Sequence, residues 1–278
     1  TTLFRSVHAE RRHRRTRHAA AEVTAVHEEV GELLLLRLRR RLRLRGVVGD
    51  LLLRRVADRL LLLDLLPLRQ AFAARNIAPP PQLNNAIDRM MPMLRFFRHG
   101  DGNFAHFNGM GPTHPDLIGT ILAYDDARGA PLSNASHSGY QRVEVKDLLV
   151  LMDTGTPPPI AVSQEAHAGC LSFELSHQLQ RIVVNCGLPA TSRDTWRQVA
   201  RATAAHSTVV FNDTSSCRFL ESGSFKRIIG TPIVSGPTHI PVAREERSDA
   251  LILRASHDGY AERFGVIHQR ALKLAAEG

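Results

Sequence analysis

The sequence is poor in cysteine and contains no long apolar run. Three of the 278 residues are cysteines, Cys170, Cys186 and Cys217, and their number and irregular spacing exclude a disulfide scaffold or a cysteine-rich zinc module. No apolar run approaches the roughly 18 to 20 residues that a membrane span needs, so we expect none. The chain also lacks a GxGxxG motif, a Walker loop and a nucleophile elbow. Nucleotide-cofactor chemistry and acyl-enzyme hydrolysis therefore have no support.

Positive charge is concentrated at the start of the chain. Residues 1–60 hold 15 arginines and 7 acids, a balance of +8, whereas the remainder holds 21 basic residues and 20 acids, a balance of +1. The arginine and leucine repeats predict a basic low-complexity arm over 1–60. Three interpretations stay open: an arm for nucleic acid or acidic polysaccharide, a solvated segment without a specific partner, or a GC-rich gene read out of frame. Because the remainder is nearly neutral, we expect no nucleic-acid partner.

The ends of the chain carry no targeting signal. The opening TTLFRSVHAERRHRR is charged but has no apolar h-region or small-residue cleavage site after it, so no secretion signal is visible. The chain begins with Thr1 and ends at LKLAAEG. We therefore expect a fragment that lacks both natural termini.

Helical patterns occupy residues 61–130. Apolar residues at Ile87, Met90, Met91 and Leu94 are three or four positions apart, which predicts one buried stripe on a helix. We expect Pro92 to kink or interrupt that helix. Two further helices are predicted, in LLLDLLPLRQAFAARN and at about 115–126, with a glycine-punctuated loop at 100–111.

Short β-rich runs follow over residues 131–278. Alternating or continuous apolar residues between turn residues predict antiparallel strands. These runs are YQRVEV, LLVLMDTG, CLSFELSH, QRIVVNCG, STVVFND, IPVAR, ALILRAS and FGVIHQRALKL. We therefore predict an α+β protein in which helices precede an antiparallel β-sandwich.

Three ordered motifs in the β-rich half carry a family resemblance. They are AHAGCLSF at 166–173, VVNCG at 183–187 and AAHSTV at 204–209. HSGYQR at 137–142 and SHDGYAERFGVIHQR at 256–270 match an opening strand and a later hairpin of the same family. In this order the motifs resemble heparinase II/III-type polysaccharide lyases, from about Leu61 to the end of the chain.

The resemblance implies a fold and a metal site. It implies the end of an α/α-toroid over 61–130, joined to a truncated β-sandwich over 131–278, with a substrate cleft between them. It also implies zinc held by His167, the residue at position 185, and His206. Neutral imidazoles suit zinc. Position 185 is Asn185 where the family has Asp, and an amide oxygen is a weaker donor than a carboxylate, so a purely hydrogen-bonded cluster is the alternative.

Candidate catalytic residues come partly from the resemblance and partly from the residues themselves. Glu165 stands where the family has the first histidine of its HxH pattern, and a carboxylate there can act as a base or orient a sugar hydroxyl. An exposed structural acid is the alternative. The other candidates are His99, His106 and Asn108 in the glycine-rich loop, and Tyr140 near the β motifs. A connecting loop and a buried structural tyrosine are the corresponding alternatives.

The resemblance implies a carbon-oxygen lyase that cleaves a uronate-containing, acidic polysaccharide by β-elimination, in the periplasm or cell envelope. The alternative is a noncatalytic carbohydrate-binding or envelope-associated domain that keeps the lyase fold, with Glu165 and Asn185 as signs of an altered site. A product with an unsaturated uronate distinguishes the enzyme from the binding domain.

Overall fold

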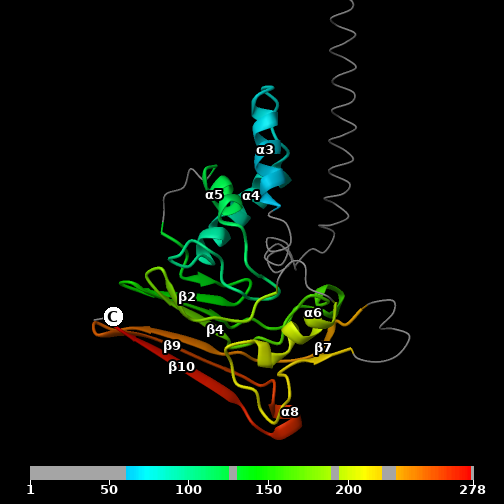
Figure 1. The fold of residues 1–278 in the computed structure, drawn as a ribbon, viewed down its shortest axis with the longest axis vertical. Coiled ribbons are helices and arrows are strands. Elements are labelled where there is room, and N and C mark those ends of the chain that lie inside the picture. The colour runs from blue at the N-terminus through cyan, green and yellow to red at the C-terminus, as the bar shows by residue number, and fades with distance from the viewer. Residues whose placement is uncertain (1–60, 125–129, 189–193, 221–229, 277–278) are drawn as a thin grey trace, which may run out of the picture. The chain divides into compact units, whose positions relative to one another are not determined.

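The computed structural model describes residues 61–124, 130–188, 194–220 and 230–276 (Figure 1). All of them belong to the second of the two units into which the chain divides, residues 49–278. The predicted arm at 1–60 lies outside the described residues. Within the described ranges, no helix has the length and apolar character to cross a membrane.

The helical part comprises α3 (Leu62–Ala73), α4 (Pro81–Phe96) and α5 (Pro115–Leu122). Helices α4 and α5 each begin with a proline, whose fixed φ angle suits the first helical turn. All four residues of the predicted stripe, Ile87, Met90, Met91 and Leu94, are buried in α4, and Leu83 is buried as well. Pro92 does not interrupt α4, which continues through that residue to Phe96, and the alternative expectation of a kink there stays a prediction.

A five-stranded antiparallel sheet follows, in the order β1-β2-β3-β4-β5. Its strands are β1 (Asn134–Ala135), β2 (Tyr140–Val145), β3 (Leu148–Asp153), β4 (Phe173–His177) and β5 (Gln180–Val183). Buried apolar residues fill β3, which lies at the centre of this sheet. The register of β2 and β3 places Tyr140 opposite Asp153 at one end of the sheet.

The second layer is a three-stranded antiparallel sheet, β8 (Val242–Glu246), β9 (Ala250–His257) and β10 (His268–Ala275), in the order β10-β9-β8. Val143, Val150 and Met152 of the first sheet share one buried cluster with Leu253 and Leu274 of the second. The two sheets therefore pack face to face as a sandwich. The predicted α+β class, helices followed by antiparallel sheets, is confirmed.

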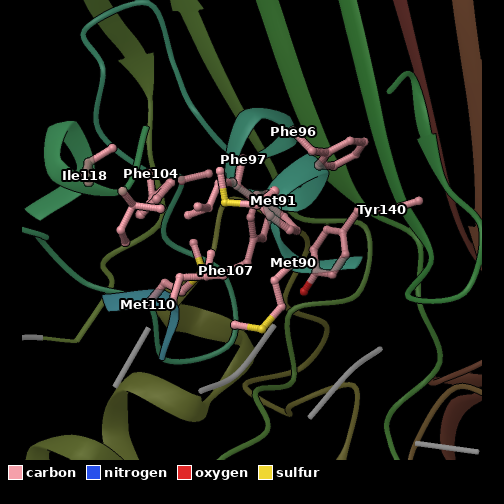
Figure 2. Close-up of a cluster of buried hydrophobic side chains, with 14 of the residues drawn as sticks. Met90, Met91, Phe96, Phe97, Phe104, Phe107, Met110, Ile118 and Tyr140 are labelled. Carbon is pink, nitrogen blue, oxygen red and sulfur yellow. The ribbon is translucent and has the colours of Figure 1, made fainter. Parts of the chain in front are cut away.

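The helices pack on the opposite face of the first sheet. Their core cluster includes Leu149 and Leu151 of β3 and Tyr140 of β2. The Tyr140 ring makes edge contacts with the rings of Phe97 and Phe107, at centroid distances of 4.9 and 5.2 Å (Figure 2). Tyr140 therefore joins the loop after α4 to the first strand pair of the sandwich.

The region around residues 194–219 differs from the sequence-based expectation. The predicted strand STVVFND at 207–213 was wrong, because those residues form turns and an isolated bridge between Phe211 and Thr214. An unpredicted helix, α6 (Asp194–Arg201), precedes the short 3-10 helix η2 (Thr203–Ala205). The remaining elements are η1 (Ile160–Val162), β6 (Arg218–Phe219), β7 (Ile233–Ser235) and α8 (Ala261–Phe264).

Candidate functional site

His167 and His206 lie together in the structure. His167 Nδ1 is 3.0 Å from His206 Nε2, and the two rings meet edge to face. Both side chains are buried. The two histidines, 39 positions apart, thus converge as predicted. They do so from loops rather than neighbouring strands, since His167 precedes β4 and His206 follows η2.

The hydrogen bonds define which ring nitrogens of this pair carry protons. His206 Nδ1 lies 2.8 Å from the Ala202 carbonyl oxygen, which can only accept, so Nδ1 is the donor. Burial lowers the pKa of His206 and favours its neutral form, whose Nε2 is then an acceptor. His167 Nδ1 therefore donates to His206 Nε2. In its neutral form His167 keeps an acceptor at Nε2, the nitrogen that faces Gly109.

The donor set at this pair does not complete a zinc site. Two zinc-bound nitrogens in a tetrahedral site lie roughly 3.3 Å apart, so the imidazoles themselves fit as two ligands. However, Asn185 Oδ1 accepts a hydrogen bond from Ser207 N at 2.8 Å, and Asn185 Nδ2 is buried without a hydrogen-bond partner in the described structure. Across the described ranges, no three His, Cys, Asp or Glu side chains form a metal-binding group. Zinc therefore stays a prediction, which metal analysis of the purified protein tests.

Tyr140, Asn108 and His167 meet at a small pocket. Asn108 Nδ2 donates to the Tyr140 hydroxyl at 2.5 Å, and His167 N donates to Asn108 Oδ1 at 3.0 Å. The phenol thus comes from β2, the amide from the loop after α4 and the imidazole from the loop before β4. The described residues lining the pocket are Asn108, Ser138, Tyr140, Asp153, Gly155, Thr156, Pro157, Pro158, His167, Cys170 and Cys217.

The buried carboxylate of Glu174 on β4 organises the surrounding backbone. Its Oε1 accepts from His106 N at 2.8 Å and from Asn185 N at 3.1 Å. Its Oε2 accepts from His99 Nε2 at 3.1 Å and from Arg181 at 3.4 Å. Burial raises the pKa of Glu174, but these hydrogen bonds outweigh it and hold the pKa below its ordinary value. Glu174 therefore ties the helical loop to the sheet as an ionised group.

His99 also contacts Ser176, which creates a serine, histidine and glutamate series. Ser176 Oγ lies 2.7 Å from His99 Nδ1, and His99 Nε2 contacts Glu174. All three side chains are buried in the junction between the helices and the sheet. A substrate has no access to this serine, so the series is structural and not a hydrolytic triad.

The structure separates the other two catalytic candidates from the pocket. The ring of His106 lies beside Gly187, where an added Cβ would be 2.9 Å from the imidazole Cγ, and burial lowers the pKa of His106. Glu165 is exposed, and its carboxylate lies 3.9 Å from Arg197 Nη2. The catalytic roles predicted for these two residues stay predictions.

Sequence reasoning did not identify Glu174 or Asp153 as members of the site. Glu174 directly follows the LSF motif, and Asp153 ends an apolar strand before a turn, which are weak signals of a buried or pocket-lining carboxylate. Asn108 was one of three candidates in the glycine-rich loop, with His99 and His106. Only its contacts with Tyr140 and His167 distinguish it.

The family model "Heparinase II/III-like, C-terminal" matches residues 127–278. Over 216 residues the chain is 34% identical to FtsZ-localized protein C of Caulobacter vibrioides, which covers 78% of this chain and 37% of that protein.

Solved structures share the fold. Heparinase III superposes with a TM-score of 0.53 at 11% identity, over 75% of this chain and 35% of that one. A mutant heparan sulfate lyase from Pedobacter heparinus superposes with a TM-score of 0.50 at 16% identity, over 70% of this chain and 31% of the lyase chain. The chain thus spans about a third of the length of these relatives.

Proposed function

Because the chain belongs to the heparinase II/III-like family, we propose that the protein is a carbon-oxygen lyase that cleaves a uronate-containing polysaccharide by β-elimination. One observation carries the proposal: the hydroxyl-bearing Tyr140 and the imidazole of His167 line a single pocket, joined through Asn108. Such a pair can supply both proton transfers that elimination needs.

The reaction needs two groups near the scissile bond, one that acts as a base and one that acts as an acid. The base removes the proton on the carbon next to the uronate carboxylate. The electron pair forms a carbon-carbon double bond while the bond to the 4-linked sugar oxygen breaks, and that oxygen takes a proton from the acid. His167 Nε2, an acceptor in the neutral ring, is our proposed base, and the Tyr140 hydroxyl is our proposed acid.

Glu165 and His106 have supporting positions in this proposal. Glu165 lies on the same loop as His167, two residues earlier, where an exposed carboxylate can orient a sugar hydroxyl. The backbone of His106 is held by Glu174, and His106 lies two residues before Asn108. Both residues are therefore on the two loops that form the pocket.

Product formation tests the proposal. The purified protein is mixed with a panel of uronate polymers, and the new ultraviolet absorbance of an unsaturated uronate is followed. Tyr140→Phe removes only the hydroxyl and should lower the rate by about 100-fold or more, because general acid catalysis contributes roughly that much. Tyr124→Phe, in the helical part, is the matched control and should keep the rate.

A noncatalytic polysaccharide-binding domain is the second candidate. Two observations favour it. Glu165 stands where the family has a histidine, and no lysine or arginine is among the described residues that line the pocket. Binding of a uronate polymer without any product from the wild-type protein supports this second function and contradicts the first.

The periplasm or cell envelope is our proposed location for either function, since that is where the family resemblance places an acidic polymer substrate. Fractionation of the native cells with an antibody to the protein tests it. Recovery of the protein only in the cytoplasmic fraction contradicts it.

A further inference from the structure

Helix α6 presents an exposed aromatic side chain next to the site. Trp196 is 64% exposed and Val199, one turn later, is 57% exposed. Large apolar side chains three positions apart share one helix face, so these two residues form a single apolar surface. Exposed apolar surface beside a candidate site commonly marks a place where a ligand binds.

Helix α6 is fixed to the loop that carries the site residues. Arg201, at its last position, is buried and donates to the carbonyl oxygens of Ala166 at 2.7 Å and Ser163 at 3.0 Å. Ala166 lies between Glu165 and His167. These hydrogen bonds therefore fix the position of α6 relative to Glu165 and His167.

Arg197, the residue after Trp196, brings a positive charge to the side of α6 that contacts Glu165. It precedes Arg201 by four residues and so lies on the same helix face, one turn closer to the start of α6. Its Nη2 is 3.9 Å from Glu165 Oε2, and the two side chains are 29% and 60% exposed. Its buried Nε has no hydrogen-bond partner within the described residues. An ion pair this long and exposed contributes little and exchanges readily for a better acceptor.

We propose that Trp196 and Arg197 form a sugar-binding subsite for an acidic polysaccharide, with the indole stacked on a sugar ring and the guanidinium bound to a uronate carboxylate. The subsite deepens the proposed function and rests on it for the substrate class. A planar guanidinium binds a carboxylate through two parallel hydrogen bonds, which the pair with Glu165 does not achieve.

This charge arrangement also assigns a competing role to Glu165. Its carboxylate contacts the same guanidinium that the ligand carboxylate needs. Removal of the Glu165 charge should therefore increase the affinity for an acidic ligand. A neutral polysaccharide should bind the subsite more weakly, because it can stack on Trp196 but cannot pair with Arg197.

Tryptophan fluorescence tests the subsite directly, because Trp196 is the one tryptophan among all 278 residues. The whole chain is titrated with a uronate oligosaccharide and, separately, with a neutral oligosaccharide of the same length. We expect the uronate ligand to shift the emission and to protect it from acrylamide quenching. Higher salt should weaken that response, since the charges are exposed.

Four test variants and one control variant define the expected pattern. Arg197→Gln should weaken uronate binding about tenfold, as for the loss of a charge-assisted hydrogen bond. Trp196→Ala, measured by calorimetry, should weaken it by about three- to tenfold, and Trp196→Phe should restore part of the loss. Glu165→Gln should strengthen binding. Arg218→Gln, an exposed arginine on β6, is the matched control and should leave binding unchanged.

The outcomes separate this inference from the proposed function. A shifted emission with no unsaturated product supports the subsite and contradicts the lyase. Product formation with an unchanged emission, and with normal activity in Arg197→Gln, supports the lyase and overturns the subsite. Uronate binding that leaves Trp196 fully open to acrylamide also overturns it, and then a protein partner becomes the better explanation of the exposed surface.

Discussion

Acid should weaken the fold through a second pair of buried histidines. His257 at the end of β9 lies opposite His268 at the start of β10, with His257 Nε2 3.1 Å from His268 Nδ1. Gly259 N donates to His257 Nδ1 at 3.0 Å, so that nitrogen must stay unprotonated. The two residues are 1% and 8% exposed. Burial, and to a smaller extent the His268 charge, lowers the pKa of His257 from 6.5 to about 4.

The sign and size of the effect follow from proton linkage. The pKa of His257 is about 4 in the folded chain and 6.5 in the unfolded chain, so between these pH values only the unfolded chain binds the proton. The free energy of unfolding is therefore highest above about pH 6.5 and falls as the pH drops towards 4. At 1.36 kcal/mol per pKa unit, His257 alone accounts for at most about 3 kcal/mol of this loss. Protonation below pH 4 causes no further loss through this group.

Urea unfolding between pH 4 and 8 measures the effect. His257→Asn keeps an oxygen that can accept from Gly259 N but cannot titrate, so its stability should fall by about 3 kcal/mol less than that of the wild type over this range. His177→Asn, at the exposed end of β4, is the control and should follow the wild type. Equal losses in His257→Asn and the wild type would refute the reasoning.

Three further substitutions test the fold around the site. Glu174→Gln should lower the free energy of unfolding in urea by about 3 to 5 kcal/mol, because it leaves the partners of a buried carboxylate uncompensated. Glu246→Gln, at an exposed position, is the control and should change it by less than about 1 kcal/mol. Equal effects would contradict the assigned role of Glu174. Tyr260→Phe removes the hydroxyl that contacts the carbonyl oxygens of Val209 and Thr214, and we expect a loss of about 1 to 2 kcal/mol, measured in the same way. An unchanged midpoint in Tyr260→Phe would show that these two contacts are weak in solution. Leu151→Ala, at a fully buried position of the central strand, should cost about 2 to 5 kcal/mol and lower the melting temperature.

The order of helices and strands could be predicted from local sequence patterns. Apolar residues three and four positions apart predicted α4. Runs of alternating or continuous apolar residues between turns predicted β2, β3, β8, β9 and β10. These patterns work because one buried face leaves a period of 3.6 in a helix and of two in a strand. The strand predicted at 207–213 failed because Val209, Val210 and Phe211 are apolar but exposed, and no strand among the described residues pairs with them.

The candidate site depended on contacts between distant segments. The motifs predicted that His167 and His206 would meet, which the structure confirms. They did not predict that Asn108 would bridge Tyr140 and the His167 backbone, or that Glu174 would hold the backbone of His106 and Asn185. Such partners are 11 to 68 residues apart in the chain, and no local periodicity encodes them.

The sequence by itself determined the class of the fold, the family and the convergence of one histidine pair, because the periodicity of apolar residues and the order of motifs are local features of the sequence. Only the tertiary structure decided which polar groups share a pocket, which carboxylate is buried, and that Trp196 and Arg197 are fixed beside the site loop. Those outcomes depend on how layers pack and which hydrogen bonds they satisfy, and a linear pattern does not contain that information.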